Sequence, residues 1–533
     1  MEQRNVVKED DDYVGETKVY RLKKGEVGTW GAIAEEIAAM APACDSVAFV
    51  VSSAAFAMIL TPLAFLVATL TMFLEVNTLY HLSRRHASAG GYYGYIAHAY
   101  GPVPAVTAGL MYPMYQIVST AAIPVFVAGV FLPGAVEYFL HFGMPAWIWI
   151  PFILVVIIVP IAIAIVGIRP QMKYIKFASF FELIFLAVIS AIEIIKAPDN
   201  TINVFNPYAW PQFNSLFAPN GGVFAGIGLG MVFGLTSFIG YGGSAPLGEE
   251  ANHPKAITRS LTVGLLMVGL VLTEVAYAQI VGWGTSVPLI NGFLKQTIPG
   301  VLVAVAYTGV IGGVMFTLVA FNSAFSDSVA MQANAGRVYF AMGRDGILPS
   351  FFSKIHKKYT TPSNALWFVA IVSSVVAVVA TFLVTAGAGI PVSSLIFSSA
   401  TSSNVVSALE SSFDFLTTMA LGGLIITHVL LNTSVITLFR RLKEKHTGAF
   451  DFIIHGISHY AFPVIATIIF IFVLYESAVT FVYPVAEAVV AIVIYTVFCI
   501  YYALRMKSRK PKLMERAGKS VNLVDEEHGN GDQ

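Results

Sequence analysis

The sequence predicts an all-α membrane protein that crosses the bilayer twelve times, and three observations support this fold class. The 533 residues are 56% hydrophobic and only 12% charged, with a mean hydropathy of +0.74, whereas soluble domains carry about 25% charged residues. Long apolar segments recur along the chain, and each can cross a bilayer core, which needs about 20 helical residues. Basic residues gather in alternate connections between these segments.

The twelve apolar segments define the domain organisation. A leader over 1–28 precedes a core over 29–440, which holds helices 1–10. Helices 11 and 12 follow over 441–505, and 506–533 form a polar tail. Glycine-rich interruptions and the lack of strand alternation favour helices over a barrel. The segments are 32–57, 61–82, 103–132, 146–167, 174–196, 222–248, 258–283, 300–331, 365–387, 414–438, 459–479 and 482–504.

The distribution of lysine and arginine predicts the orientation. Of the 31 basic residues, 29 fall in the leader, the tail or the connections on one side, and only Lys196 and Lys295 fall on the other. The positive-inside rule therefore places both termini in the cytoplasm, as expected for a multi-pass protein of the cell membrane. The leader has no apolar core, so no cleavable signal peptide is expected. The 31 acidic residues balance the basic ones, which argues against a nucleic-acid partner.

The sixth segment contains helix-breaking residues at mid-depth: Gly240, Gly242, Gly243 and Pro246. Glycine loses backbone entropy in a helix, and proline removes a hydrogen-bond donor. A broken helix survives in hydrocarbon only where it is buried or lines a cavity, because each unpaired backbone group costs several kcal/mol. The pattern favours a transporter's substrate cavity. The alternative is a kinked helix whose glycines allow close packing.

The first segment carries a matching interruption. Pro42 predicts one half-helix ending near Met40 and a second beginning near Pro42, whose N-terminus directs N–H groups into the cavity. If segments 1–5 and 6–10 are two halves, each break lies in the leading helix. Five is an odd number, so the halves would insert in opposite orientations. Paired breaks of this kind indicate the central site of a secondary transporter.

Three stretches resemble the amino acid–polyamine–organocation (APC) family of secondary transporters: 88–101 (SAGGYYGYIAHAYG), 238–254 (FIGYGGSAPLGEEANHP) and 337–349 (RVYFAMGRDGILP). The resemblance covers about 30–505. It implies a five-plus-five inverted-repeat (LeuT-like) fold with broken helices 1 and 6, alternating access, and no cofactor. No phosphate-binding loop or His-Glu-x-x-His motif occurs in the sequence, so an ATP-driven pump or a zinc protease is not expected.

The resemblance also implies a substrate site. The unwound part of span one, whose N–H groups would hold a substrate carboxylate, corresponds to Ala41, Pro42, Ala43 and Cys44. The unwound part of span six, whose carbonyls would accept from the substrate ammonium, corresponds to Phe238, Ile239, Gly240, Tyr241 and Gly242.

Two departures from the family pattern modify this expectation. Span one has Ala-Pro-Ala-Cys-Asp in place of the common Gly-Ser-Gly break. Gly242 replaces a glutamate found in many members, which is expected to enlarge the pocket and favour neutral amino acids. Two further residues have two interpretations each. Asp45 either caps the second half-helix or binds the ammonium, and Tyr115 either lines the pocket or packs.

Ionisable residues within spans usually face an interior path. Glu182 falls where some relatives carry a lysine thought to replace a sodium ion, so a carboxyl there is a candidate proton-coupling group. The alternative is a glutamate on a polar helix face. Asp327 with Ser328 is a second candidate, either in a sodium site or paired within the bundle. The predicted function is proton-coupled amino acid import, with sodium-coupled symport, exchange or uniport as alternatives.

Four further expectations concern the ends of the spans. Glu249 and Glu250 either form a gate pair with Lys255 and Arg259 or lie at a solvated helix end. The amphipathic segment 337–352 is expected to be a short helix on the cytoplasmic surface, and 388–413 an external connection. His81 and His428 are interpreted as structural.

Overall fold

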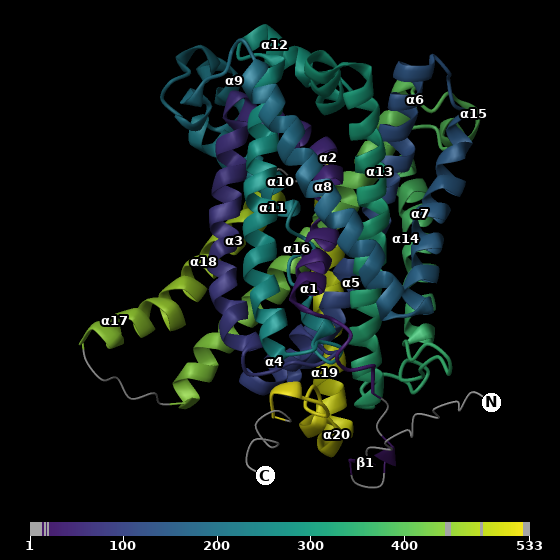
Figure 1. Cartoon of the computed structure of the whole chain (residues 1–533), viewed down its shortest axis with the longest axis vertical. Helices are drawn as coiled ribbons and strands as arrows, with labels where there is room; N and C mark the ends of the chain where they lie inside the picture. The colour runs from purple at the N-terminus through teal and green to yellow at the C-terminus, as the bar shows by residue number, and fades with distance from the viewer. Residues whose placement is uncertain (1–12, 15–16, 19–20, 443–448, 480–482, 526–533) are drawn as a thin grey trace, which may run out of the picture.

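The computed structural model describes residues 13–14, 17–18, 21–442, 449–479 and 483–525, and these form a helical bundle (Figure 1). A two-stranded hairpin pairs β1 (Tyr13–Val14) with β2 (Thr17–Lys18). The long helices are α3 (Thr61–Ser83), α5 (Pro102–Phe126), α7 (Trp149–Val166), α8 (Ile168–Lys196), α11 (Pro254–Trp283), α13 (Pro299–Arg344), α14 (Ser363–Gly387), α16 (Ser403–Leu442), α18 (Phe462–Val479) and α19 (Val485–Arg509).

Shorter elements break or connect these helices. The first broken helix consists of two halves, α1 (Thr29–Met40) and α2 (Pro42–Ala57). Helix α10 (Val223–Thr236) is followed by a series of turns. A π-helical turn joins α5 to α6, and another joins α17 to α18. The remaining short α-helices are α4 (Tyr92–Ala99), α6 (Leu132–Leu140), α9 (Asn214–Phe217), α12 (Val287–Phe293), α15 (Ser394–Phe397), α17 (Ala449–Gly456) and α20 (Pro511–Arg516).

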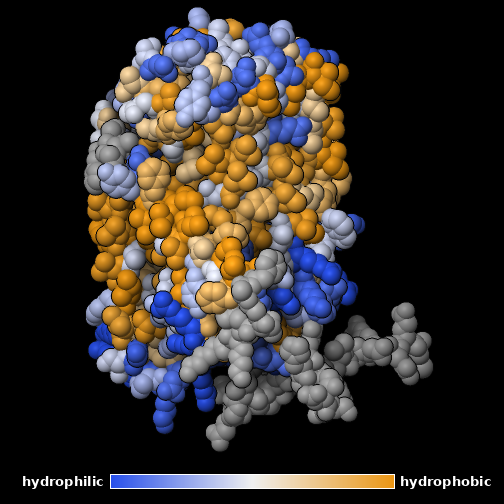
Figure 2. Space-filling view, turned by 90° about the vertical axis from the view of Figure 1, so that its left-hand side faces the viewer, coloured by the Kyte–Doolittle hydropathy of each residue, from blue (hydrophilic) through white to orange (hydrophobic). Residues whose placement is uncertain are grey.

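The described residues contain ten stretches long and apolar enough to span a membrane, or eleven if the bent pair Pro211–Asn220 and Val223–Thr236 is one span. The first stretch, Thr29–Ser83, is 55 residues long and contains α1, α2 and α3. Apolar side chains form a broad band around the middle of the face seen in Figure 2, with polar residues at both ends. This band is the surface expected of a bilayer-spanning protein.

The structure corrects two expectations about the ends of the spans. Helix α13 continues to Arg344, and Arg337 is only 3% exposed, so 337–352 is not a separate surface helix. Helix α16 begins at Ser403, which shortens the connection expected over 388–413. The polar tail contacts the bundle, because Asp345 accepts hydrogen bonds from Gly518 N–H, at 2.7 Å, and from the Ser520 hydroxyl.

Candidate substrate site

The first break is a single residue. Helix α1 ends at Met40, α2 begins at Pro42, and Ala41 between them has φ 38° and ψ 55°, the left-handed conformation. Proline suits the first position of α2 because the first N–H groups of a helix have no intrahelical partner. The predicted pair of half-helices is therefore confirmed.

A carboxylate from another helix caps the second half-helix. Glu182 on α8 accepts from Ala43 N–H through Oε1 at 2.6 Å, and the same oxygen accepts from the Ser323 hydroxyl at 2.6 Å. Cys44 N–H donates to Ser323 Oγ at 3.2 Å. A negative charge at a helix N-terminus is stabilised by the unpaired N–H groups and the helix dipole. In this conformation Glu182 therefore occupies a donor that the sequence analysis assigned to a substrate carboxylate.

The second break is a run of turns rather than one residue. From Ser237 to His253 the chain forms no α-helix. Backbone hydrogen bonds between residues three apart form tight turns instead, such as Tyr241 N–H to Phe238 O at 2.9 Å and Gly243 N–H to Gly240 O at 3.0 Å. This confirms the predicted break in span six.

Glu36, one turn before the first break, holds the second break in place. Its carboxylate accepts from Gly242 N–H at 2.9 Å, from Ser244 N–H at 2.9 Å and from the Ser244 hydroxyl at 2.5 Å. The side chain is fully buried. A buried charge is tolerated only when several donors satisfy it, so Glu36 connects the two broken helices. The sequence analysis did not single out Glu36.

The two breaks also touch through their backbones. A Cβ atom on Gly240 would lie 1.7 Å from the carbonyl oxygen of Ala39 and 2.0 Å from its carbonyl carbon. Only glycine allows such a close approach of two chains. The turn run therefore lies directly against the end of α1.

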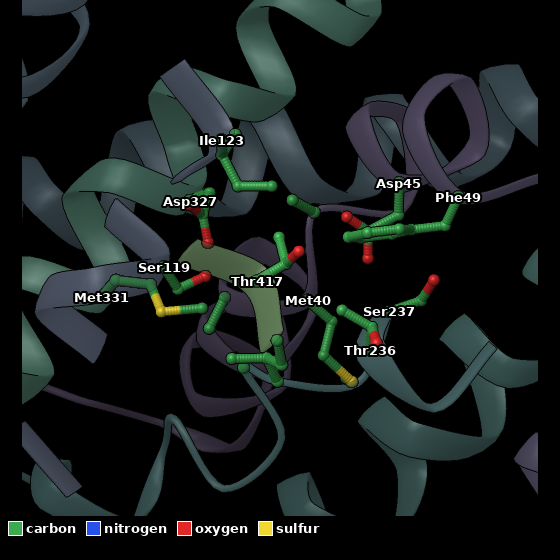
Figure 3. A pocket seen from close by; sticks show the side chains of 14 residues that line it. Met40, Asp45, Phe49, Ser119, Ile123, Thr236, Ser237, Asp327, Met331 and Thr417 are labelled. Carbon is green, nitrogen blue, oxygen red and sulfur yellow. The ribbon is translucent and has the colours of Figure 1, made fainter. Parts of the chain in front are cut away.

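A small cavity of about 10 Å³ lies beside this contact (Figure 3). Its walls combine apolar side chains with two carboxyl groups, Asp45 on α2 and Asp327 on α13. Both oxygens of Asp327 are buried without a hydrogen-bond partner among the described residues. The lining residues are Ala39, Met40, Ala41, Asp45, Phe49, Ser119, Ile123, Thr236, Ser237, Ile239, Gly240, Asp327, Met331 and Thr417.

The structure brings five of the predicted site residues to the cavity: Ala41, Asp45, Ile239, Gly240 and Asp327. The others lie outside its lining, namely Pro42, Ala43, Cys44, Tyr115, Glu182, Phe238, Tyr241, Gly242 and Ser328. Two of these, Ala43 and Gly242, donate backbone N–H groups to the glutamates that hold the breaks.

Two predicted residues lie outside the cavity lining, and other residues of the same helices make the contacts expected of them. Tyr115 packs edge-on against Tyr112, with ring centroids 5.2 Å apart, while Ser119 on the next turn of α5 lines the cavity. Ser328 accepts from Gln332 Nε2 at 2.7 Å. Ser323, which shares a face of α13 with Asp327, is the serine that contacts Glu182. Residues four apart share a helix face, so this periodicity could have identified Ser119 and Ser323.

Gly242 does not enlarge the cavity, which corrects the expectation drawn from it. A Cβ atom there would lie 1.7 Å from the Tyr92 hydroxyl, and Gly242 has φ +85°. The Tyr92 hydroxyl donates to Tyr241 O at 3.1 Å. The missing side chain therefore makes room for a hydrogen bond that supports the turn run.

The end of the turn run that leads into α11 is joined to α13 by two buried ion pairs. Glu250 lies 2.5 Å from Arg337 Nε, and Glu249 lies 2.9 Å from Arg344 Nη1. All four side chains are at most 5% exposed. The interpretation as a solvated helix end is therefore wrong, and the ion pairs involve α13 rather than Lys255 and Arg259.

Further buried polar groups lie beside the turn run. His428 on α16 is fully buried, with Nδ1 2.8 Å from Glu75 Oε2. The other oxygen of Glu75 accepts from Asn432 Nδ2 at 2.7 Å. The described residues contain no group of three or more His, Cys, Asp or Glu side chains placed to hold a metal ion.

Comparison with known protein families identifies the family to which this chain belongs. The sequence profile of the amino acid permease family matches residues 28–504. The chain therefore belongs to the amino acid permease family, a family of transporters rather than enzymes, and the resemblance to the APC family is confirmed.

Individual relatives are distant. The chain is 26% identical to an uncharacterized transporter of Rhizobium meliloti over 53% of its length and 57% of the relative's. It is also 26% identical to a branched-chain amino acid permease of Bacillus subtilis, over 51% and 53% of the two lengths. It is likewise 26% identical to a chloroplastic cationic amino acid transporter of Arabidopsis thaliana, over 54% of this chain and 49% of the relative. The matches thus span about half the length of these curated relatives.

A solved structure shows the same fold. A manganese transporter of Eremococcus coleocola aligns with a TM-score of 0.54 over 95% of this chain and 100% of its own, at 10% identity. At that identity the likeness concerns the fold alone. The chain is thus an all-helical, multi-pass membrane protein with a LeuT-like fold.

Proposed function

We propose that this protein is a secondary active transporter that imports amino acids across the cell membrane by alternating access. The observation that carries the proposal is the cavity at the contact between the two broken helices. Unpaired carboxyl oxygens on Asp327 and the nearby carboxyl of Asp45 suit a substrate ammonium. Binding shifts the balance between inward- and outward-facing states by the difference in affinity for the two.

We infer twelve spans in two inverted five-helix halves, followed by two further helices. The stretch Thr29–Ser83 counts as two spans because α1–α2 and α3 are each long enough to cross the bilayer. The bent pair that includes α10 supplies the twelfth. Breaks in the leading helix of each half support the repeat, and the basic residues support cytoplasmic termini.

Glu182 is the proposed proton-coupling group. As a carboxylate it holds Ala43 N–H and the Ser323 hydroxyl, and hydrogen bonds to a charged acceptor are about twice as strong as neutral ones. Protonation would weaken this hold and release Ala43 N–H to a substrate carboxylate. Proton and amino acid would then bind together, as symport requires. Sodium coupling, exchange and uniport are the alternatives.

Neutral amino acids are the proposed substrates. Phe49, Ile123, Ile239 and Met331 give the cavity apolar walls, which suit an aliphatic side chain. The two carboxyl groups favour cationic amino acids as the second candidate. A thermal-shift screen of the purified protein against the twenty amino acids separates the two, because a ligand at 100 times its Kd stabilises by about 2.7 kcal/mol.

The test of proton coupling uses proteoliposomes with an imposed pH gradient and the amino acid that the screen identifies. Wild-type protein should accumulate this substrate, whereas Glu182→Gln should retain the thermal shift and counterflow but lose accumulation. Glu274→Gln, a half-buried glutamate on α11, is the matched control and should accumulate normally. Accumulation by Glu182→Gln would exclude Glu182, and counterflow without accumulation by the wild type would favour an exchanger.

A further inference from the structure

The segment that follows α19 packs against the bundle along most of its described length. Its helix, α20, lies at the same end of the molecule as α4 (Figure 1). Apolar side chains spaced along the segment are at most 5% exposed, namely Met514, Ala517, Val521 and Leu523. Burial of apolar surface stabilises such an arrangement. We name residues 511–523 the tail strap.

Asp345, directly after α13, connects the tail strap to α4. Its Oδ2 accepts from Gly518 N–H at 2.7 Å and from the Tyr93 hydroxyl at 2.8 Å. Its Oδ1 accepts from the Ser520 hydroxyl. The Asp345 residue is only 7% exposed, and a buried carboxylate is tolerated when several donors satisfy it. The end of α13, α4 and the tail strap are therefore joined at one carboxyl group.

Gly518 allows the tail strap to approach the backbone of α4 closely. It has φ +72°, in the left-handed region. A Cβ atom there would lie 2.5 Å from Ala97 Cβ and 3.0 Å from Tyr93 O. Glycine is the residue that tolerates both this conformation and so short an approach. The contact with α4 therefore depends on the absence of a side chain at Gly518.

The last part of the tail strap pairs with the connection between α3 and α4. Ala87 N–H donates to Asn522 Oδ1 at 2.9 Å, and Leu523 N–H donates to Ala87 O at 2.9 Å. Asn522 Nδ2 also donates to Arg85 O at 3.2 Å. Both backbone polar groups of Ala87 are thus hydrogen-bonded to the tail strap. These bonds join residues more than 400 positions apart in the sequence.

The same connection lies against the second break. A Cβ atom on Gly248, in the turn run, would lie 2.5 Å from Ser88 N and 2.9 Å from Ala87 C. A Cβ atom on Gly91 would lie 3.1 Å from Pro246 N. Close-packed segments transmit displacement to one another. The connection between α3 and α4 therefore joins the tail strap to the second break.

A separate route leads from the tail strap to the same break through α13. Arg344 precedes Asp345 in the sequence and pairs with Glu249 of the turn run at 2.9 Å. The tail strap thus reaches the turn run through Ala87 on one route and through Asp345 and Arg344 on the other. Two independent connections restrain a segment more strongly than one.

We propose that the tail strap is a conformational restraint that opposes opening of the bundle at the second break. Separation of the turn run from the connection between α3 and α4 would strain the bonds at Ala87. Movement of the turn run away from α13 would strain those at Asp345. Hydrogen bonds to a carboxylate are stronger than neutral ones, which favours the closed arrangement. The restraint is additional to the proposed transport and does not depend on the substrate.

Hydrogen–deuterium exchange of the purified full-length protein tests the restraint, because amide exchange reports local opening. Gly518→Ala removes the fit on α4, and Ser520→Asp places a second carboxylate beside Asp345, where like charges repel. Each variant should speed exchange about tenfold in residues 84–91, because a bond to a charged group is lost or strained. Exchange in residues 237–253 should also rise, by a smaller factor, because the tail strap holds them only through other segments.

Ser508→Asp is the matched control, since it adds the same charge at an exposed serine on α19 and should exchange as the wild type does. Peptides from α14, which the tail strap is not proposed to restrain, report on the whole fold and should exchange equally in all proteins. If α14 also exchanged faster, the variant would be globally destabilised. Ser520→Ala, which removes one hydroxyl, would then replace it, with faster exchange expected in the same two segments.

Three outcomes would overturn the proposal. The first is unchanged exchange in residues 84–91 of the folded variants. The second is faster exchange there with none in residues 237–253, which would show that the tail strap holds the connection but not the break. The third is an equal increase in Ser508→Asp. These measurements require no transported substrate, so their failure is distinct from a failure of the proposed amino acid import.

Discussion

The two helix breaks at the cavity are built in different ways. The first is one left-handed residue, Ala41, with a full helix on either side. The second is a run of turns that extends from Ser237 to His253. Each is held by a glutamate from elsewhere in the fold: Glu182 on α8 caps the first, and Glu36 on α1 holds the second.

The difference indicates separate tasks for the two glutamates. Glu182 Oε1 holds one backbone donor and one hydroxyl, while its Oε2 has no partner among the described residues. Glu36 accepts three hydrogen bonds, two of them from the backbone of the second break. A carboxylate with many donors is a structural anchor, whereas one with few donors is easier to protonate or displace. The first break is therefore the better candidate for a moving part, and the second for a fixed one.

The largest expected effect tests the backbone contact between the breaks. Gly240→Ala places a methyl group 1.7 Å from Ala39 O, and backbone atoms cannot move aside as a side chain can. The loss should exceed the ~1–3 kcal/mol typical of an overpacked core. It should appear as loss of monodisperse protein in size-exclusion chromatography and loss of uptake. Gly228→Ala on α10 is the control, because its methyl would meet only the Phe472 ring at 3.7 Å.

Removing the charge of Glu36 should have the next largest effect. Glu36→Gln leaves one acceptor oxygen and turns an amide nitrogen toward N–H donors of the second break. The expected cost is ~1.5–3 kcal/mol, the contribution of a hydrogen bond to a charged group, read as a lower melting temperature in detergent. Glu274→Gln should melt as the wild type does. If Glu36→Gln were equally stable, the second break would not depend on this anchor.

A smaller effect is expected from the serine at the first break. Ser323→Ala removes the acceptor for Cys44 N–H and a donor to Glu182, at a cost of ~1 kcal/mol. Ser374→Ala, whose hydroxyl bonds to Ala370 O one turn earlier, should cost less. The melting temperatures of both variants measure these costs in stability. An equal loss of stability in Ser323→Ala and Ser374→Ala would contradict a specific role for Ser323.

The smallest effect concerns the segment leading into α1, where Glu26 N–H and Val27 N–H both donate to Glu250 O at 3.0 Å. Arg169 hydrogen-bonds to Glu26 and holds the pKa of that carboxyl below its ordinary value. A lowered folded-state pKa contributes stability above the ordinary pKa, near 4.3, and this contribution is lost as pH falls through the lowered value.

Arg169→Ala should therefore lower the melting temperature slightly at pH 7, because an exposed ion pair contributes little. The difference from the wild type should shrink as the pH falls below 4. Lys173→Ala, an exposed lysine one turn along α8, should show no such pH dependence. A difference that stayed constant with pH would show that Arg169 acts through something other than the Glu26 carboxylate.

Local sequence features predicted the positions of both breaks, because Pro42 and the glycines near Gly240 act on their own backbone. They did not predict which side chains hold the breaks. The bond from Gly242 N–H to Glu36 joins residues 206 positions apart, and the bond from Ala43 N–H to Glu182 joins residues 139 apart. The same limitation explains why neither alternative for Glu249 and Glu250, a pairing with Lys255 and Arg259 or a solvated helix end, included α13.

The sequence by itself determined that the chain is helical, spans a membrane and is interrupted twice, because segment length, apolarity and helix-breaking residues are local properties. Only the tertiary structure decided which carboxyl meets which backbone donor, that Gly242 accommodates Tyr92, and that Asp45 and Asp327 share one cavity. These contacts depend on how distant helices pack against one another. Hydrophobicity alone leaves that packing undetermined, because every apolar face is equally satisfied by lipid or by another helix.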